Sequence, residues 1–373
     1  MSSTFGFIIH PLEIQDVTRK FGFASKLPPS WVEAAVKHLP PLKVSHITGV
    51  KSRLGPEVDG WFVGCPLTAR QMLRLDERFV MKKVIASARK AEELGAKIVG
   101  LGAFTSVVGD AGITVAENVG IAVTTGNSYT VATALEGIEY AAGLLGLDIS
   151  GERVAVLGAS GSIGKACARI MARRGFEVTL VARRREPLEE VAALIAAETG
   201  QTPRIETEIG QGLRGARIVI AVTSAIEAVV DPEALEPGAI VCDVARPRNV
   251  SRAVAKARDD VFVFEGGVVA PPGDVDFGFN FGFPPKTGYA CMAETMILAL
   301  EGRFENYSLG RDLDVDKIEE IAALAKKHGF ALAGLRSFER AVTPEYVAAV
   351  KEGMRRRGVL KESQEVLARV DTE

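Results

Sequence analysis

The sequence predicts an α/β protein with two sheet-containing domains, the second of them doubly wound, followed by C-terminal helices. Three observations predict this class. The 373 residues exceed one average domain. Short apolar runs alternate with helical patterns, as in mostly parallel sheets. The 38 glycines and an aromatic content of only 6% are more typical of a glycine-turned α/β fold than of a β-sandwich. We expect an N-terminal α/β domain at 1–150, the doubly wound domain at 151–288 and helices at 289–373.

The first domain is predicted to contain three buried strands and two helices. The apolar runs 5–9, 60–64 and 97–101 have the length of strands. A single long helix is expected over 67–94, ending at Gly95, where glycine takes the left-handed cap easily. A second helix over 130–145 closes the domain.

The second domain shows a regular alternation of strand and helix. Strands are expected at 153–157, 177–182, 218–222, 240–243 and 261–264, and helices at 163–174 and 187–198. A loop rich in Gly, Pro and Phe follows at 266–288. Helices are then expected at 289–301 and 315–328, with a charged, solvated helix beyond Thr343.

Composition excludes several classes of protein. The 45 basic and 47 acidic residues leave a formal charge of -2, which does not favour a nucleic-acid partner. Hydrophobic residues at 47% and charged residues at 25% exclude wholesale disorder. No apolar run reaches the roughly 18 residues of a membrane span, and the N-terminus lacks the features of a signal peptide. Four widely spaced cysteines suit neither a metal site nor a disulfide framework. We expect a reduced, cytoplasmic enzyme.

A glycine-rich loop stands where the doubly wound domain begins. Gly158-Ala-Ser-Gly161-Ser-Ile-Gly164 lies between a predicted strand and a predicted helix, the arrangement of a Rossmann dinucleotide site. A glycine-rich turn without a ligand is the alternative. The predicted cofactor-binding residues here are Gly158, Ser160, Gly161, Ser162, Ile163, Gly164 and, after a later strand, Thr223.

The end of the second strand distinguishes between the two nicotinamide dinucleotides. NAD sites usually place a carboxylate there, whereas this strand runs into three consecutive arginines at 183–185. Guanidinium groups bind a 2′-phosphate well, so Arg183 and Arg184 predict NADP(H). A merely solvated surface is the alternative.

One cysteine has the setting of a nucleophile. Cys291 falls in the first turn of the helix after the dinucleotide domain, where unpaired N–H groups favour a thiolate. Such a thiolate beside a hydride donor indicates thioester chemistry, although a packing cysteine remains the alternative. Cys65, at a strand end, is the second candidate, and Cys167 and Cys242 are expected in the core.

Several motifs occur together in one order along the chain. They are Phe5-Gly-Phe-Ile-Ile-His10, Gly102-Ala-Phe-Thr-Ser106, Thr124-Thr-Gly-Asn-Ser-Tyr-Thr130, the Gly158 loop, Glu265-Gly-Gly-Val-Val269, Tyr289-Ala-Cys-Met-Ala-Glu294 and Glu301-Gly-Arg-Phe-Glu-Asn-Tyr-Ser-Leu-Gly-Arg311. From about Phe5 to Phe330 the chain thereby resembles the aldehyde-forming long-chain acyl-[acyl-carrier-protein] reductases best known from cyanobacteria. The segment 276–291 is shorter and richer in Gly and Phe than in that family.

The resemblance implies an activity and a role for Cys291. It implies NADPH-dependent reduction of a fatty acyl thioester, on acyl carrier protein or coenzyme A, to the free aldehyde through an acyl-cysteine at Cys291. Because segment 276–291 differs from the family, the length of the acyl chain and the choice between carrier protein and coenzyme A stay open. Whether the aldehyde passes to a downstream enzyme that consumes it is open too.

Further residues have two interpretations each. Thr105, Ser106 and Asn127 are candidate oxyanion donors or turn caps. Glu294 and His10 are candidates to move a proton or hold the cysteine, or they form structural pairs. The aromatics Phe277, Phe279, Phe281 and Phe283 line a tunnel for the chain or simply pack. The cations Arg70, Arg74, Arg78 and Lys82 recur along one predicted helix, and either steer an acidic carrier or are a solvated face.

Two other functions stay open. One is an NADP-dependent dehydrogenase of a small hydroxy or keto acid, of the shikimate-dehydrogenase type, in which Cys291 is packed. The other is a non-catalytic module that senses NADPH.

Overall fold

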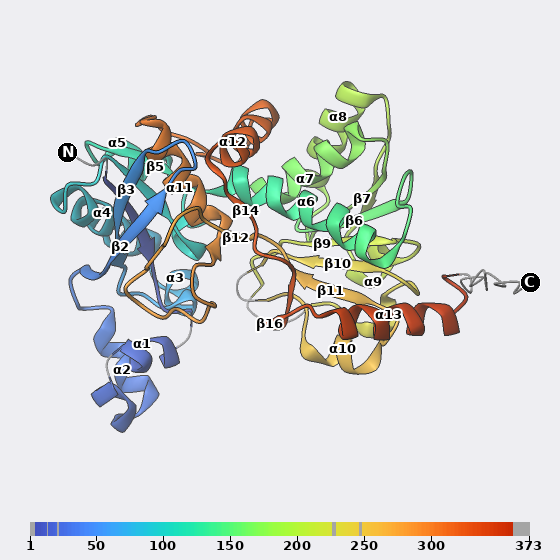
Figure 1. Ribbon diagram of the computed structural model, residues 1–373, viewed down its shortest axis with the longest axis horizontal. Coiled ribbons are helices and arrows are strands. Elements are labelled where there is room, and N and C mark those ends of the chain that lie inside the picture. The colour runs from blue at the N-terminus through green and yellow to red at the C-terminus, as the bar shows by residue number, and fades with distance from the viewer. Residues whose placement is uncertain (1–3, 13, 21, 226–228, 246–247, 361–373) are drawn as a thin grey trace, which may run out of the picture.

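The computed structural model describes residues 4–12, 14–20, 22–225, 229–245 and 248–360. It has two lobes, each built on its own sheet, with helix α6 (Asn127–Leu145) between them (Figure 1). The α/β class and the parallel-sheet dinucleotide domain predicted from the sequence are confirmed.

The first sheet has five strands in the order β2-β3-β1-β4-β5. Its strands are β1 (Thr4–Ile9), β2 (Leu42–Lys51), β3 (Glu57–Gly64), β4 (Ile98–Leu101) and β5 (Ala122–Thr124). Strand β2 was not expected, and it pairs antiparallel with β3 through a short turn, so the sheet is mixed. The other pairs are parallel and place the carboxyl ends of β1, β4 and β5 at one edge.

The single helix expected over 67–94 is wrong. Two helices occupy this stretch, α3 (Ala69–Arg74) and α4 (Glu77–Glu93). Leu75 is extended, and the side chain of Asp76 accepts a hydrogen bond from the Phe79 N–H, which makes it the N-cap of α4. An aspartate that caps a new helix is more favourable here than one within a helix, and the chain therefore breaks before it.

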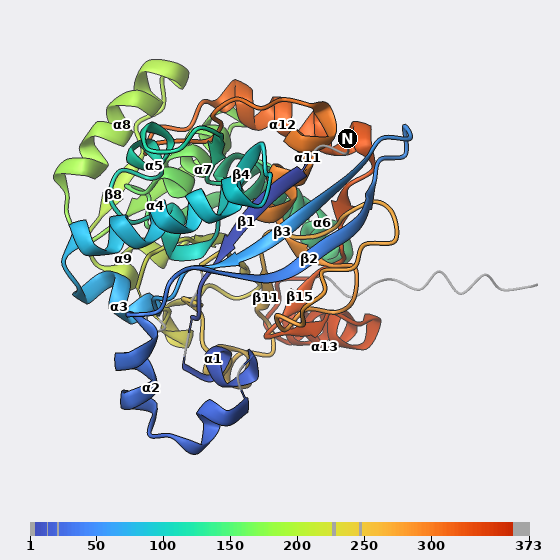
Figure 2. The ribbon, with the colours of Figure 1, turned by 90° about the vertical axis from the view of Figure 1, so that its left-hand side faces the viewer.

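A small helical segment projects from the first lobe (Figure 2). It contains α1 (Ile14–Lys20), a 3-10 turn (Gly22–Lys26) and α2 (Pro29–Val36). Among its described residues, Val17, Val32 and Val36 form a small core, with Ile14 packed against them. Another short helix, α5 (Ile113–Glu117), lies beside α4.

The second sheet is parallel and has the order β11-β10-β9-β6-β7-β8. Its strands are β6 (Arg153–Leu157), β7 (Glu177–Val181), β8 (Arg204–Glu206), β9 (Ile218–Ala221), β10 (Ile240–Asp243) and β11 (Phe262–Glu265). Its helices are α7 (Ser162–Arg173), α8 (Glu186–Thr199), α9 (Ile209–Leu213) and α10 (Arg252–Ala257). The strand order reverses beside β6, and ligands bind outside the carboxyl ends of strands at such a switch point.

The helices expected at 289–373 pack with different sheets. Helix α11 (Ala290–Glu301) contacts β1, β3 and β4, and α12 (Val315–His328) contacts α6 and α11. Helix α13 (Pro344–Arg356) lies beside the second sheet and buries Val350 and Met354 in its core, so the expectation of a fully solvated tail helix is wrong. The last residues of that expected tail, 361–373, lie outside the described residues.

Short strands complete the structure. They are β12 (Val268–Ala270), β13 (Gly288–Tyr289), β14 (Ala331–Leu332), β15 (Arg336–Ser337) and β16 (Arg340–Ala341). Two 3-10 turns lie at Ala103–Ser106 and Pro232–Ala234. Of the helices in the described ranges, none combines the length and apolar character needed to cross a bilayer.

Candidate active site

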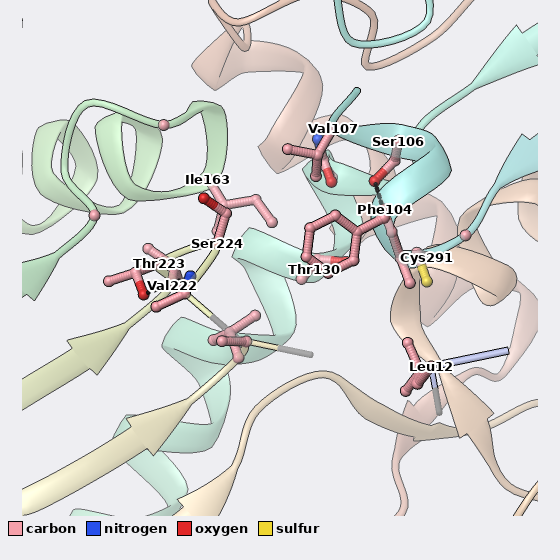
Figure 3. Close-up of a pocket in the computed structure, with 18 of the residues that line it drawn as sticks. Leu12, Phe104, Ser106, Val107, Thr130, Ile163, Val222, Thr223, Ser224 and Cys291 are labelled. Carbon is pink, nitrogen blue, oxygen red and sulfur yellow. Dashed lines mark hydrogen bonds between the residues drawn. The ribbon is translucent and has the colours of Figure 1, made fainter. Parts of the chain in front are cut away.

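A cavity of about 1520 Å³ lies between the two lobes and reaches from the glycine loop to the N-terminal helical segment. Single small-molecule sites occupy about 300–1,000 Å³. The cavity therefore has room for a dinucleotide and a second ligand together. In Figure 3, Val222, Thr223 and Ser224 face it from the second lobe and Cys291 and Ser106 from the opposite side, with Phe104 and Thr130 between them.

The glycine loop has the shape of a pyrophosphate cradle. Gly158 has a φ of +87°, and a Cβ on Gly164 would lie 2.3 Å from the Gly158 carbonyl oxygen, so neither position accepts a side chain. Helix α7 begins after Gly161 without any side-chain cap, which leaves its first N–H groups facing the cavity. All seven predicted cofactor-loop residues, Gly158, Ser160–Gly164 and Thr223, line the cavity.

The three arginines after β7 have different settings. Arg183 and Arg184 are exposed and line the cavity. Arg185 stands at the N-cap of α8, with Nη1 3.8 Å from Glu189 Oε1, and it does not line the cavity. The residues predicted for a 2′-phosphate are thus the two that face the site.

Asn249 supports this end of the site and was missed by the sequence analysis. Its Oδ1 accepts a hydrogen bond of 2.8 Å from the Thr223 N–H, which fixes the loop after β9. It lies well beyond the glycine loop in sequence, with no motif to mark it.

Cys291 lies in the first turn of α11 and lines the same cavity, partly exposed. The helix has no side-chain cap, and the Ala290 N–H donates to the Gly267 carbonyl at 2.7 Å, which anchors its start. Gly126, at the N-terminus of α6, touches the Cys291 backbone so closely that a Cβ would lie 2.3 Å from Cys291 Cα. The positive end of α11 and this close packing hold the sulfur at the cavity wall.

The other cysteines are not suited to act as nucleophiles. Cys65 lines the cavity, but it is only 1% exposed and burial raises its thiol pKa to about 12. Cys167 and Cys242 are fully buried in the core of the second lobe, as expected. Cys65 is therefore a thiol at neutral pH, and the second candidate nucleophile is set aside.

Glu294 is fully buried and does not line the cavity; it connects neighbouring segments through hydrogen bonds. Its Oε1 accepts hydrogen bonds from Thr124 Oγ1 (2.5 Å) and Ser308 Oγ (2.7 Å), and its Oε2 accepts one from the Tyr129 N–H (2.7 Å). Burial raises its pKa, and these hydrogen bonds act in the opposite direction. The carboxyl thus ties α11 to the end of β5 and the start of α6, and it does not reach the cavity.

The three candidate oxyanion donors are placed differently. Asn127 lines the cavity, and its Nδ2 donates to Ser162 Oγ at 3.2 Å, which joins α6 to the glycine loop. Ser106 also lines it, but its hydroxyl donates to the Ala103 carbonyl. Thr105 is 1% exposed, donates to the Gly102 carbonyl and is not part of the wall. The turn-cap interpretation therefore fits Thr105.

His10 lines the cavity as a neutral ring. The Phe104 N–H donates to its Nε2 at 3.1 Å, so that nitrogen carries no proton, and Nδ1–H donates to the Pro11 carbonyl at 3.0 Å. Burial lowers the pKa of His10 to about 4. With both nitrogens engaged, His10 holds the turn that carries Phe104 and has no free proton to give.

The half of the cavity away from the glycine loop is lined mainly by apolar side chains, with Asp16 and His10 among them. Part of its wall comes from the projecting helical segment, which the sequence analysis did not identify, through Leu12, Val17, Val36 and Leu39. Of the four phenylalanines, only Phe279 and Phe281 line the cavity, whereas Phe277 is buried against Phe62. Two of the four thus remain candidates to contact an acyl chain.

Comparisons with known proteins match the second lobe by itself and, separately, most of the chain. A family model described as shikimate/quinate 5-dehydrogenase matches residues 139–265. The aminotransferase PigE of a Serratia species is 33% identical over 306 residues, which cover 81% of this chain but 36% of PigE. The chain therefore spans about a third of the length of that relative. A long-chain acyl-[acyl-carrier-protein] reductase of Synechococcus elongatus is 29% identical over 354 residues, covering 87% of this chain and 98% of the reductase.

Among solved structures, L-tryptophan dehydrogenase from Nostoc punctiforme is similar over 95% of this chain and 89% of its own, at 14% identity and a TM-score of 0.39. The family model covers the glycine loop, the arginines and every strand of the second sheet. The chain accordingly contains a Rossmann-like dinucleotide-binding domain, and its cofactor is NADP(H).

Proposed function

We propose that this protein reduces a fatty acyl thioester to the aldehyde with NADPH, using Cys291 as the nucleophile. One observation carries the proposal: Cys291 lines the same cavity as the glycine loop, and that cavity continues into a wall made mainly of aliphatic and aromatic side chains. The distant relative from Synechococcus, named a long-chain acyl-[acyl-carrier-protein] reductase, supports the same substrate class.

The first half of the reaction uses the start of α11. The Cys291 thiolate attacks the thioester carbonyl and forms a new C–S bond, the C–S bond to the carrier breaks, and the carrier leaves as a thiolate that takes a proton from water. The positive dipole end of α11 favours the thiolate before attack. The apolar wall at Leu12, Val17 and Val36 excludes water from the acyl-enzyme and so limits its hydrolysis to the acid.

The second half requires a hydride, which NADPH supplies when it is bound. Asn127 is the donor best placed for the oxyanion of the resulting hemithioacetal, because one of its two Nδ2 hydrogens bonds Ser162 and the other is available. Collapse of the hemithioacetal breaks the C–S bond, releases the aldehyde and restores the thiolate. Glu294 holds Asn127 and Cys291 in place indirectly, because it binds the turn between β5 and α6.

A dehydrogenase of a small hydroxy or keto acid is the second candidate. The shikimate/quinate family model favours it, although the match is confined to 139–265. Such substrates carry a carboxylate and hydroxyls, whereas the substrate half of this cavity presents mainly aliphatic side chains, including Leu39, Leu42 and Val44. The wall therefore suits an alkyl chain better.

The decisive variant is Cys291→Ser, measured with palmitoyl thioester and NADPH. The proposal expects aldehyde formation to fall by about 1,000-fold or more, since serine is a far weaker nucleophile without an adjacent base. NADPH affinity, measured by fluorescence titration, should be unchanged. Cys167→Ser, in the core of the second lobe, is the control for lost packing. Retained aldehyde formation in Cys291→Ser would exclude Cys291 as the nucleophile. No aldehyde from the wild type, together with turnover of a small hydroxy or keto acid, would favour the dehydrogenase, and NADPH binding without any turnover would favour a sensing module.

A further inference from the structure

The cavity opens to solvent beside helix α3. Leu73 and Leu39 both line the cavity and are 49% and 43% exposed, so they form the rim of an opening. Val107, which is 50% exposed, marks a second opening on the side of Ser106. The two openings differ in the number of cations nearby. Arg311 is the cation that lines the cavity near Val107, whereas several exposed arginines lie close in sequence to Leu73.

The outer face of α3 combines charge with the rim. Arg70, Leu73 and Arg74 stand at positions i, i+3 and i+4 and share one exposed face, while Ala69 and Met72 are buried on the other side. On the next helix, α4, Arg78 and Lys82 are exposed one turn apart. We call Arg70, Leu73, Arg74, Arg78 and Lys82 the α3–α4 ridge.

The ridge adjoins the other side of the opening. Lys83, next to the ridge on α4, donates from Nζ to the Leu39 carbonyl at 2.8 Å. The rim residue Leu39 is thus held against α4. The apolar opening and the cations therefore form one continuous surface.

The cations of the ridge have no internal counter-charge. Within the described ranges, none of Arg70, Arg74, Arg78 and Lys82 has a carboxylate at ion-pair distance. Cations elsewhere are commonly paired, as Arg169 and Arg173 are with Glu198. Asp76, an acidic residue between α3 and α4, uses its carboxylate to cap α4. The positive charge of the ridge is therefore not neutralised within the protein and can attract a negatively charged partner.

We propose that the α3–α4 ridge is the docking surface for an acidic acyl-carrier protein, which presents its thioester arm to the opening at Leu39 and Leu73. The inference rests on the proposed function and adds the partner and its site. Complementary charge accelerates and orients the encounter, and the exposed leucines receive the apolar base of the arm. The chemistry at Cys291 does not depend on these cations.

Charge reversal with two forms of one substrate tests the docking surface. Arg70→Glu/Arg74→Glu is compared with the wild type on palmitoyl-carrier protein and on palmitoyl-pantetheine, which is uncharged. Because electrostatic steering changes association rates by about 10-fold or more, we expect kcat/KM for the carrier substrate to fall by about that factor and to lose its salt dependence. The pantetheine substrate should be reduced at the wild-type rate. The control Lys256→Glu/Arg340→Glu makes the same charge change at exposed residues beside the second sheet.

Other outcomes separate this inference from the proposed function. Equal losses on both substrates, or no loss on either, overturn the docking surface while leaving the reduction intact. Unchanged carrier kinetics together with lost binding to phosphatidylglycerol vesicles would identify the ridge as a membrane surface instead. If the wild type reduces neither substrate, the proposed function fails, and titration of carrier protein against both variants still decides whether the ridge binds it.

Discussion

At the scale of single residues, hydrogen bonds show which side chains hold the site together. Glu294 is bound by hydroxyl and backbone groups away from the cavity, and both ring nitrogens of His10 bond the backbone, whereas Cys291 and Asn127 line the cavity. The sequence pointed to all four residues. It could not assign their roles, because the distinction depends on partners distant in the chain, such as Tyr129 for Glu294 and Phe104 for His10.

The lowered pKa of His10 has a consequence for stability. Since its pKa is about 4 in the folded chain and 6.5 when unfolded, the unfolded chain binds more protons between these values. His10 therefore makes the free energy of unfolding decrease as the pH falls from 6.5 toward 4. Denaturant titrations across this range should show a shallower decrease in His10→Gln than in the wild type. The variant His38→Gln, at an exposed histidine, serves as the control. If the free energy of unfolding falls equally steeply with pH in all three proteins, His10 is not held neutral by the fold.

The arginines after β7 provide a second test at this scale. In Arg183→Ala/Arg184→Ala we expect the Kd for NADPH to rise by about 10- to 100-fold, because charged hydrogen bonds to a phosphate are lost. The Kd for NADH should change little. Arg185→Ala is the matched control, since that side chain lies outside the cavity near Glu189. A parallel loss of both cofactors in the double variant would show that these arginines support the fold rather than the 2′-phosphate.

At the scale of elements, the active site depends on how two helix starts meet. Gly126 has a φ of +73° and lies against the backbone of Cys291, so α6 and α11 begin in direct contact. The sequence predicted both helices, but α6 begins at Asn127, three residues before the predicted start. The early start could not be predicted from helical periodicity, because Gly126 and Glu294 fix it through contacts with α11.

Gly126→Ala tests this junction. The added Cβ would lie 2.3 Å from Cys291 Cα, so α11 must shift and misplace the sulfur. We expect acylation of Cys291 to slow by roughly 100-fold, the usual cost of an ångström-scale misplacement, with NADPH binding retained. Gly143→Ala, on an open face of α6, should instead raise the free energy of unfolding by about 0.5–1 kcal/mol. Stopped-flow acylation and thermal unfolding measure the two effects. A wild-type acylation rate in Gly126→Ala would show that close contact between α6 and α11 does not position Cys291.

At the scale of the whole molecule, local signals of the sequence were sufficient for five of the six strands of the second sheet and for helices α7 and α8, so the doubly wound class followed from the alternation. The short edge strand β8 and the short helices α9 and α10 were missed, because each is too short to show a period. Features that depend on contacts between distant parts of the chain could not be predicted from the sequence. The antiparallel β2, the return of α11 to the first sheet and the helical segment that walls the cavity all depend on tertiary packing.

The arrangement of the molecule brings one sulfur from a late helix to a cavity shared by a nucleotide loop and an apolar wall. The most direct test is intact-mass analysis after incubation with palmitoyl thioester in the absence of NADPH. The account predicts a single palmitoyl increment, mapped by peptide analysis to Cys291, that disappears when NADPH is added and is replaced by free aldehyde. An unmodified protein, or an increment on another residue, would contradict it.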